Sequence, residues 1–196
     1  MITAIDKNTA LVLIDLQKGV VKKDTYQSAT EILKKSVILI DAFREKGLPI
    51  VVVNVNPIGA SWLNARKDQK SMLANKGTQT IAKVGISIGG FLDILDEIKT
   101  EPTDIFITKK TWNAFYNTPL HEELQKRNIT GIVLAGVATS IGVEGTARAA
   151  AELGYNISFA IDAMTDQNPE AHQNSIRNIF PRLGESGTTS DIIGKL

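Results

Sequence analysis

The feature that most constrains the fold is the alternation of short apolar runs with longer helical patterns along the chain. Five runs are rich in Ile, Val and Leu, and they cover residues 9–14, 49–55, 104–108, 131–135 and 156–161. Near-continuous apolar runs of this length are typical of strands that are covered on both faces, as in a parallel sheet. Residues 182–186 form a weaker sixth candidate.

Helical patterns with recognisable ends separate these runs. Residues 28–46 carry apolar side chains at helical spacing, and Gly47 suits a C-terminal cap. A capping side chain followed by proline starts further helices at Thr118-Pro119 and at Asn168-Pro169, where Pro181 ends the second. A last short helix is expected from Thr189.

This alternation predicts one doubly wound α/β domain over residues 1–196. Residues 56–90 fit it poorly, because the stretch is too long for an ordinary connection. We expect a partly helical excursion there, over a site or an interface.

Composition excludes several classes of protein. The chain has 22 basic and 21 acidic residues without a basic block, so we expect no nucleic-acid partner. No apolar run approaches about 18 residues, so we expect no membrane span. The absence of cysteine excludes disulfides, thiolate metal ligands and a cysteine nucleophile. The first residues, MITAIDKNTALVLIDLQ, lack the pattern of a secretory signal, so a cytoplasmic location is expected.

Polar residues and a glycine-flanked turn follow the predicted strands, where ligands bind in open parallel sheets. They are Asp15, Asn54, Asn56, Lys109, Lys110 and the turn 136–142. Each also has a structural explanation: an aspartate there can cap a helix, a lysine can be solvated, and a glycine can relieve backbone strain. Position alone therefore leaves the function open.

Three motifs together resemble the isochorismatase-like hydrolases, a family of isochorismatases, nicotinamidases and other amidohydrolases. They are LVLIDLQ, TKKTWNAFYNTPL and GVATSIGVEGTARAAAELGY, and the likeness runs from about Thr9 to the C-terminal end. The resemblance implies a three-layer α/β/α fold around a six-stranded parallel sheet. It also implies a small-molecule substrate and assembly as a homodimer or homotetramer.

Most members of that family use an Asp-Lys-Cys triad. By the resemblance, Asp15 matches the aspartate and Lys109 the lysine, with Lys110 as the alternative if the register slips by one. Gly142 falls where the cysteine stands. A covalent thioester mechanism is therefore not available to this chain.

True isochorismatases resemble this chain in having Ile-Gly at the cysteine position. Their substrate is a vinyl ether, whose hydrolysis needs a proton donor rather than a nucleophile. The resemblance implies that Asp15 is this acid and that pyruvate is released, which requires a raised Asp15 pKa. Lys109 would orient Asp15 and hold negative charge of the substrate, and Gly142 would leave room for the substrate ring.

The family resemblance also bears on metal binding. Nicotinamidases bind a metal through an aspartate and histidines after the second strand, where this chain has Asn54 and Asn56. His121 and His172 lie in helix patterns and are expected to face solvent. Neutral amides are poor ligands for Zn²⁺, so we expect no metal and no cofactor.

The family turn contains a non-proline cis peptide, which we place at Val137–Ala138. It would aim backbone N–H groups at a substrate oxygen, aided by the positive end of the following helix. Trp112 and Phe115 are expected to line the pocket, although core packing would also explain them. The expected substrate contacts are Gln17, Trp112, Phe115, Val137, Ala138, Thr139 and Ile141.

Three functions stay open at this point. The first is a cysteine-independent hydrolase of a vinyl ether or related small acid, which uses Asp15 and Lys109. The second is an amidohydrolase in which Asp15 activates water directly. The third is a non-catalytic relative that binds a small ligand or a partner at the same place.

Overall fold

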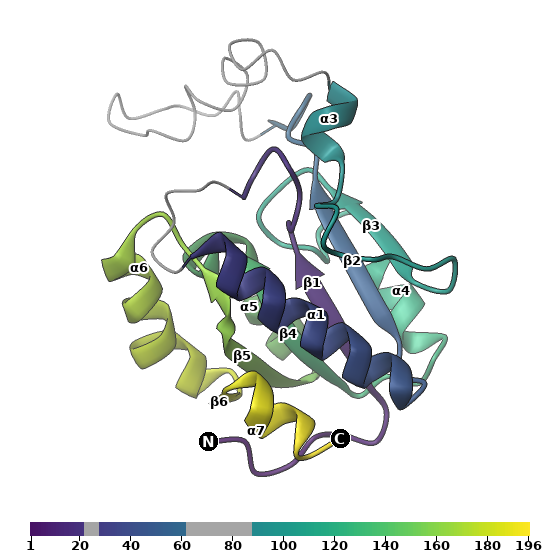
Figure 1. Ribbon diagram of the computed structural model, residues 1–196, viewed down its shortest axis with the longest axis vertical. Helices are drawn as coiled ribbons and strands as arrows, with labels where there is room; N and C mark the ends of the chain where they lie inside the picture. The colour runs from purple at the N-terminus through teal and green to yellow at the C-terminus, as the bar shows by residue number, and fades with distance from the viewer. Residues whose placement is uncertain (22–27, 62–87) are drawn as a thin grey trace.

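A six-stranded parallel sheet forms the centre of the computed structural model, which describes residues 1–21, 28–61 and 88–196 (Figure 1). The strands are β1 (Thr9–Ile14), β2 (Ile50–Val55), β3 (Ile105–Lys109), β4 (Gly131–Val137), β5 (Asn156–Thr165) and β6 (Glu185–Gly187). Their order is β3-β2-β1-β4-β5-β6, and it reverses direction between β1 and β4. The predicted doubly wound parallel sheet is confirmed, with its switch point at the carboxyl ends of β1 and β4.

Helices cover both faces of this sheet. The α-helices are α1 (Ala29–Glu45), α3 (Ile88–Leu92), α4 (Leu120–Gln125), α5 (Glu144–Glu152), α6 (Pro169–Asn174) and α7 (Thr189–Ile193). Of these, α3 lies beyond the end of the strands and not over a face (Figure 1). One apolar core joins the sheet to α1 and α7, and a second joins it to α4 and α5 on the other face (Figure 1). The predicted three-layer arrangement is therefore confirmed.

Burial of the strands explains why their sequences lack polar alternation. All six residues of β1 are buried, with Leu11 and Leu13 in the core of α1 and Val12 and Ile14 in the opposite core. The edge strand β3 instead alternates between buried and exposed residues. The central strands thus carry apolar side chains toward two cores at once.

The observed elements depart from the predicted ones in several places, and the sixth strand is one of them, since β6 is Glu185–Gly187 and not residues 182–186. Strand β5 continues to Thr165, beyond the predicted end at residue 161, after a register shift against β4. The helix from Pro169 is α-helical only to Asn174 and then continues as π and 3₁₀ turns through Arg182. Of the predicted excursion 56–90, residues 62–87 lie outside the described residues, and α3 occupies its end.

Other local predictions are confirmed. The Asn168 side chain accepts hydrogen bonds from the N–H groups of Glu170 and Ala171 and caps α6, and α7 begins at Thr189. Within the described ranges, no helix combines the length and the apolar character needed to cross a membrane.

Gly136 provides a test of how tightly β4 packs against β1. Its φ is 117°, and a Cβ there would lie 2.1 Å from the carbonyl oxygen of Ile14. We expect Gly136→Ala to lower the free energy of unfolding by about 3 kcal/mol or more, because backbone strain and overpacking act together. Urea denaturation measures this loss.

Gly154→Ala is the matched control for this prediction. Gly154 also has a positive φ, 84°, but no atom of the described residues lies within 4 Å of the point where a Cβ would stand. Only strain remains, so a loss of about 1 kcal/mol is expected. Equal losses for the two variants would contradict the close approach of β4 to β1.

Candidate active site

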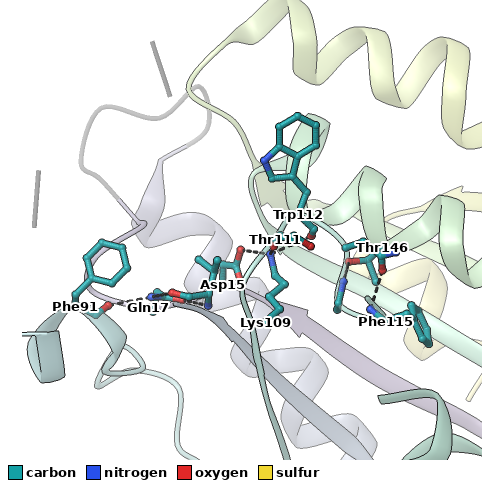
Figure 2. Close-up of polar contacts among 11 residues, drawn as sticks. Asp15, Gln17, Phe91, Lys109, Thr111, Trp112, Phe115 and Thr146 are labelled. Carbon is teal, nitrogen blue, oxygen red and sulfur yellow. Dashed lines mark hydrogen bonds and ion pairs between the residues drawn. The ribbon is translucent and has the colours of Figure 1, made fainter. Parts of the chain in front are cut away.

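The carboxyl edge of the sheet brings together the two charged residues that the resemblance selects. Asp15 directly follows β1 and Lys109 ends β3, and β2 lies between these strands. The Lys109 Nζ nevertheless reaches the Asp15 Oδ2, at 2.7 Å, across the end of β2 (Figure 2). Both side chains are buried, so this is an ion pair removed from water.

Lys109 uses its whole hydrogen-bonding capacity inside the protein. Besides Asp15, its Nζ donates to the backbone oxygens of Thr111 at 3.2 Å and Trp112 at 3.0 Å. These three acceptors match the three hydrogens of an ammonium group. Lys110 is exposed, so Lys109 and not Lys110 is the lysine that contacts Asp15.

The two carboxyl oxygens of Asp15 have different surroundings. Oδ2 accepts the bond from Lys109, while Oδ1 is buried and has no hydrogen-bond partner among the described residues. Burial raises the pKa of Asp15 to about 6, although the charge and hydrogen bond of Lys109 lower it. A proton on Oδ1 gives a neutral acid while Lys109 still donates to Oδ2.

Gly142 packs directly against this carboxyl group. A Cβ at Gly142 would lie 3.3 Å from the Asp15 Oδ2 and 2.8 Å from the Ile14 Cγ2. A side chain at position 142 would therefore point at Asp15. The expectation that Gly142 leaves room for a substrate ring is not supported, because the Ile14 methyl group occupies that space.

The turn after β4 contains a cis peptide bond between Val137 and Ala138 and continues into a π-helical turn, Thr139–Val143. Two of its N–H groups have internal acceptors. That of Ser140 donates to the Asp166 Oδ2 at 2.9 Å, and that of Ile141 to the Ala138 oxygen at 3.1 Å. These two groups do not point to a substrate oxygen, contrary to the sequence-based expectation.

The predicted contacts within the turn differ in burial. Val137 packs in the core beneath α1, and Thr139 is fully buried. Ala138 and Ile141 are half-buried. Of these four residues, only Ala138 and Ile141 keep appreciable accessible surface.

Gln17 braces the segment that carries Asp15. Its Nε2 donates to the backbone oxygens of Val55 at 3.1 Å and Phe91 at 3.0 Å, and its Oε1 accepts the Val55 N–H at 2.6 Å (Figure 2). The side chain is fully buried. Its contacts are therefore those of a residue that positions Asp15, not those of the predicted substrate contact.

The two predicted aromatic contacts lie on different sides of the site. Trp112 is 53% exposed and lines a cavity of about 780 Å³ together with Lys110, Thr111 and Tyr116. Phe115 instead packs on a core and stacks with Tyr155, with ring centroids 5.8 Å apart. Figure 2 shows it directed away from Asp15. The core-packing explanation therefore fits Phe115, which is not among the residues that line this cavity.

The expectation that the histidines face solvent is wrong for His172. His172 is fully buried, and its Nδ1 lies 2.8 Å from the Thr139 Oγ1. His121 is half-buried and lies 2.9 Å from the Tyr155 hydroxyl. The sequence did not predict the burial of His172. The helix that begins at Pro169 has no regular spacing of apolar residues, so its sequence does not show which face is buried.

Asp166 is a second residue that the sequence did not select. It is 4% exposed, and its Oδ2 accepts both the N–H and the hydroxyl of Ser140. The signal would have been its place just after β5, but the predicted strand stops at residue 161. Asp166 lies at the same edge of the sheet as Asp15.

The two asparagines at the carboxyl end of β2, one within the strand and one just after it, have protein partners. The Asn54 Nδ2 donates to the Leu92 oxygen at 3.4 Å, and the Asn56 Oδ1 accepts the Ile58 N–H at 3.2 Å. Across the part of the chain that the structure describes, no group of three or more His, Asp or Glu side chains is placed to hold a metal ion.

Comparison with known proteins gives the family. Residues 9–191 match the family model of the isochorismatase domain. The chain belongs to the isochorismatase family. It is 39% identical over 188 residues to the uncharacterized isochorismatase family protein YwoC of Bacillus subtilis, and the match covers 95% of this chain and 93% of YwoC.

Two further comparisons concern the fold and the activities found in the family. The structure of an isochorismatase family protein from Burkholderia thailandensis has a TM-score of 0.82 at 32% identity, over 98% of this chain and 97% of that one. The ureidoacrylate amidohydrolase RutB of Stutzerimonas stutzeri is 28% identical, over 90% of this chain and 77% of RutB. This chain thus lies within a family that includes hydrolases.

Removal of Lys109 tests the buried ion pair. In Lys109→Met, Asp15 keeps a buried charge without a counterion, so its folded-state pKa rises further above the ordinary value of 3.8. A raised carboxyl pKa stabilises the folded state at low pH. This stabilisation is lost as pH rises through the raised folded-state pKa. We expect a loss of about 3–5 kcal/mol at pH near 8 and a much smaller loss at pH near 5.

Lys110→Met serves as the control, because Lys110 is the exposed neighbour of Lys109. Its free energy of unfolding should change little at either pH. Urea denaturation at the two pH values makes the comparison. A Lys109→Met loss that does not depend on pH would contradict the buried-charge explanation.

Proposed function

We propose that this protein hydrolyses a small molecule without a cysteine nucleophile and that Asp15 transfers the proton. The observation that carries this proposal is the buried contact of Asp15 with Lys109, in which one carboxyl oxygen is held and the other has no described partner. With a pKa of about 6, Asp15 is present as both acid and carboxylate near neutral pH. A group with such a pKa is suited to proton transfer.

The reaction that we favour is hydrolysis of a vinyl ether. The proton on the Asp15 Oδ1 moves to the terminal carbon of the enol double bond, which leaves an oxocarbenium carbon. Water adds to that carbon and returns a proton to the Asp15 carboxylate. The resulting hemiketal then breaks its bond to the leaving oxygen and gives an alcohol and pyruvate.

Lys109 is proposed to act through Asp15. Its three donors are already used, so it keeps Oδ2 in place and stabilises the carboxylate that remains after the proton has left. The cavity beside Trp112, with Lys110 and Tyr116 in its wall, would take the body of a small substrate. This assignment needs no covalent intermediate.

A second candidate is an amidohydrolase in which the Asp15 carboxylate activates water. The similarity to RutB favours it, since that relative is named as an amidohydrolase. The two reactions require opposite states of Asp15: the vinyl ether needs the acid, and the amide needs the carboxylate. A ligand-binding relative without catalysis is the third candidate.

We propose further that the protein works in the cytoplasm as a homodimer or homotetramer. The cytoplasmic location rests on the absence of cysteine, which fits a reducing compartment. The assembly rests on the family resemblance. Light scattering coupled to size-exclusion chromatography would give the number of subunits, and a monomer would contradict the second part.

Pyruvate release from isochorismate tests the favoured reaction. We expect purified wild-type protein to release pyruvate and Asp15→Asn to lower kcat/KM by about a hundredfold or more, because an amide cannot supply the proton. Lys46→Met controls for the loss of a surface charge, because Lys46 is exposed at the end of α1 and does not line the cavity, and it should keep activity within a few-fold. No release by the wild-type protein would contradict the isochorismate assignment, and a panel of small amides followed by ammonia release would then test the second.

The pH dependence of kcat/KM separates the two chemistries. If Asp15 is a general acid, activity should fall as pH rises through about 6. If Asp15 is a general base, activity should rise over the same range and then level off. A kcat/KM that does not change between about pH 5 and pH 7 would contradict a proton-transfer role for Asp15 in either reaction.

A further inference from the structure

Two side chains from the segment after β5 hold consecutive residues of the turn 136–142. The His172 Nδ1 lies 2.8 Å from the Thr139 Oγ1. The Asp166 Oδ2 accepts the Ser140 N–H at 2.9 Å and the Ser140 hydroxyl at 2.7 Å. We call these three contacts the Asp166–His172 clamp.

The clamp is buried and is itself held in place. Thr139 and His172 have no exposed surface, and Asp166 is 4% exposed. The Asp166 Oδ1 accepts the N–H of Asn168, the residue that caps α6 and so carries His172 into position. Burial lowers the pKa of His172, although the charge of Asp166 raises it, so the ring is neutral at pH 7.

The turn that the clamp holds forms a wall of the Asp15 site. A Cβ at Gly142 would come within 3.3 Å of the Asp15 Oδ2, and one at Gly136 would overlap the Ile14 backbone. The two ends of the turn therefore pack on the residues that carry the carboxyl group. The clamped residues, Thr139 and Ser140, lie between these two contacts.

We propose that Asp166 and His172 are positioning residues that keep the turn 136–142 closed on the Asp15 carboxyl group and so keep water away from it. They act through Thr139 and Ser140. The inference rests on the proposed function in taking Asp15 as the proton-transfer group. Lys109 is the charged group that faces this carboxyl directly.

The consequence of opening the clamp follows from desolvation. If the turn moves away, water reaches the Asp15 carboxylate and stabilises its charged form. The carboxyl group then becomes more acidic, while its contact with Lys109 is kept. Fewer molecules carry the proton on Asp15 near neutral pH.

Carbon-13 NMR of the aspartate side-chain carboxyl groups tests this without substrate. The Asp15 signal is identified by its loss in Asp15→Asn, and its titration midpoint is then measured in wild type and in Thr139→Val, which removes the hydroxyl at nearly constant volume. We expect the midpoint to fall by about one pH unit in Thr139→Val. Thr139→Ser keeps the hydroxyl and should keep the wild-type midpoint.

Thr189→Val is the matched control. The Thr189 hydroxyl donates to the Asp162 Oδ1 at 2.8 Å, so this variant also removes the hydrogen bond of a buried threonine hydroxyl, whose partner here is a carboxylate of β5. The Thr189–Asp162 hydrogen bond joins β5 to α7 and does not involve the turn 136–142. Strand β5 also lies two strands away from β1 in the sheet. The Asp15 midpoint should therefore not move in Thr189→Val.

Two results would overturn the inference: an unchanged midpoint in folded Thr139→Val, or an equal shift in Thr189→Val. If Thr139→Val does not fold, Ser140→Ala tests the same inference. This variant removes the hydroxyl contact of Ser140 with Asp166 and leaves the contact of its backbone N–H. A smaller downward shift supports the inference, and no shift overturns it. If the Asp15 midpoint depends on the clamp but the protein turns over no tested substrate, the proposed function is contradicted and the inference about the clamp still stands.

Discussion

The buried ion pair between Asp15 and Lys109 is the interaction on which the rest of the site depends. Two charges removed from water are costly, and their attraction offsets this cost only with close geometry and further hydrogen bonds. The 2.7 Å contact and the two backbone acceptors of Lys109 supply both. Because the pair spans β2, it links the ends of β1 and β3 and also fixes the chain at Thr111 and Trp112.

The surroundings of the pair show how the fold keeps a carboxyl group both held and reactive. Gln17 ties the chain after Asp15 to β2 and to α3. Asp15 itself has a φ of 51°, in the left-handed region. On the other side, the turn after β4 packs on the carboxyl group and is held by Asp166 and His172. Lys109 holds the Asp15 Oδ2 between these two supports, whereas Oδ1 has no hydrogen-bond partner among the described residues.

Sequence reasoning predicts the fold well because the central strands are covered on both faces. Strand β1 is predicted with its observed ends, since all of its residues are apolar or buried. Strand β5 is predicted too short, because Asp162 interrupts its apolar run, although that carboxylate is bound by Thr189 from α7. This early end keeps Asp166 from being recognised as a residue of the sheet edge.

At the site, the motifs predict which residues matter more reliably than what their side chains contact. Asp15 and Lys109 meet as predicted. Gln17 and Phe115 are predicted as substrate contacts, but one braces the backbone and the other stacks on Tyr155. A motif gives the position of a residue along the chain, whereas the direction of its side chain depends on partners from distant segments. His172, whose partner Thr139 lies 33 residues away, shows the same limit.

The close packing of Ile14 against Gly142 has an evolutionary consequence. The methyl group of Ile14 stands 2.8 Å from where the first side-chain carbon of any other residue at 142 would begin. Ile14 branches at its own Cβ and has little freedom to turn aside, because it lies in a fully buried strand. A cysteine at position 142 would therefore require Ile14 to shift or to be replaced by a smaller residue, so the packing at position 14 bears on whether this fold can acquire thiol chemistry.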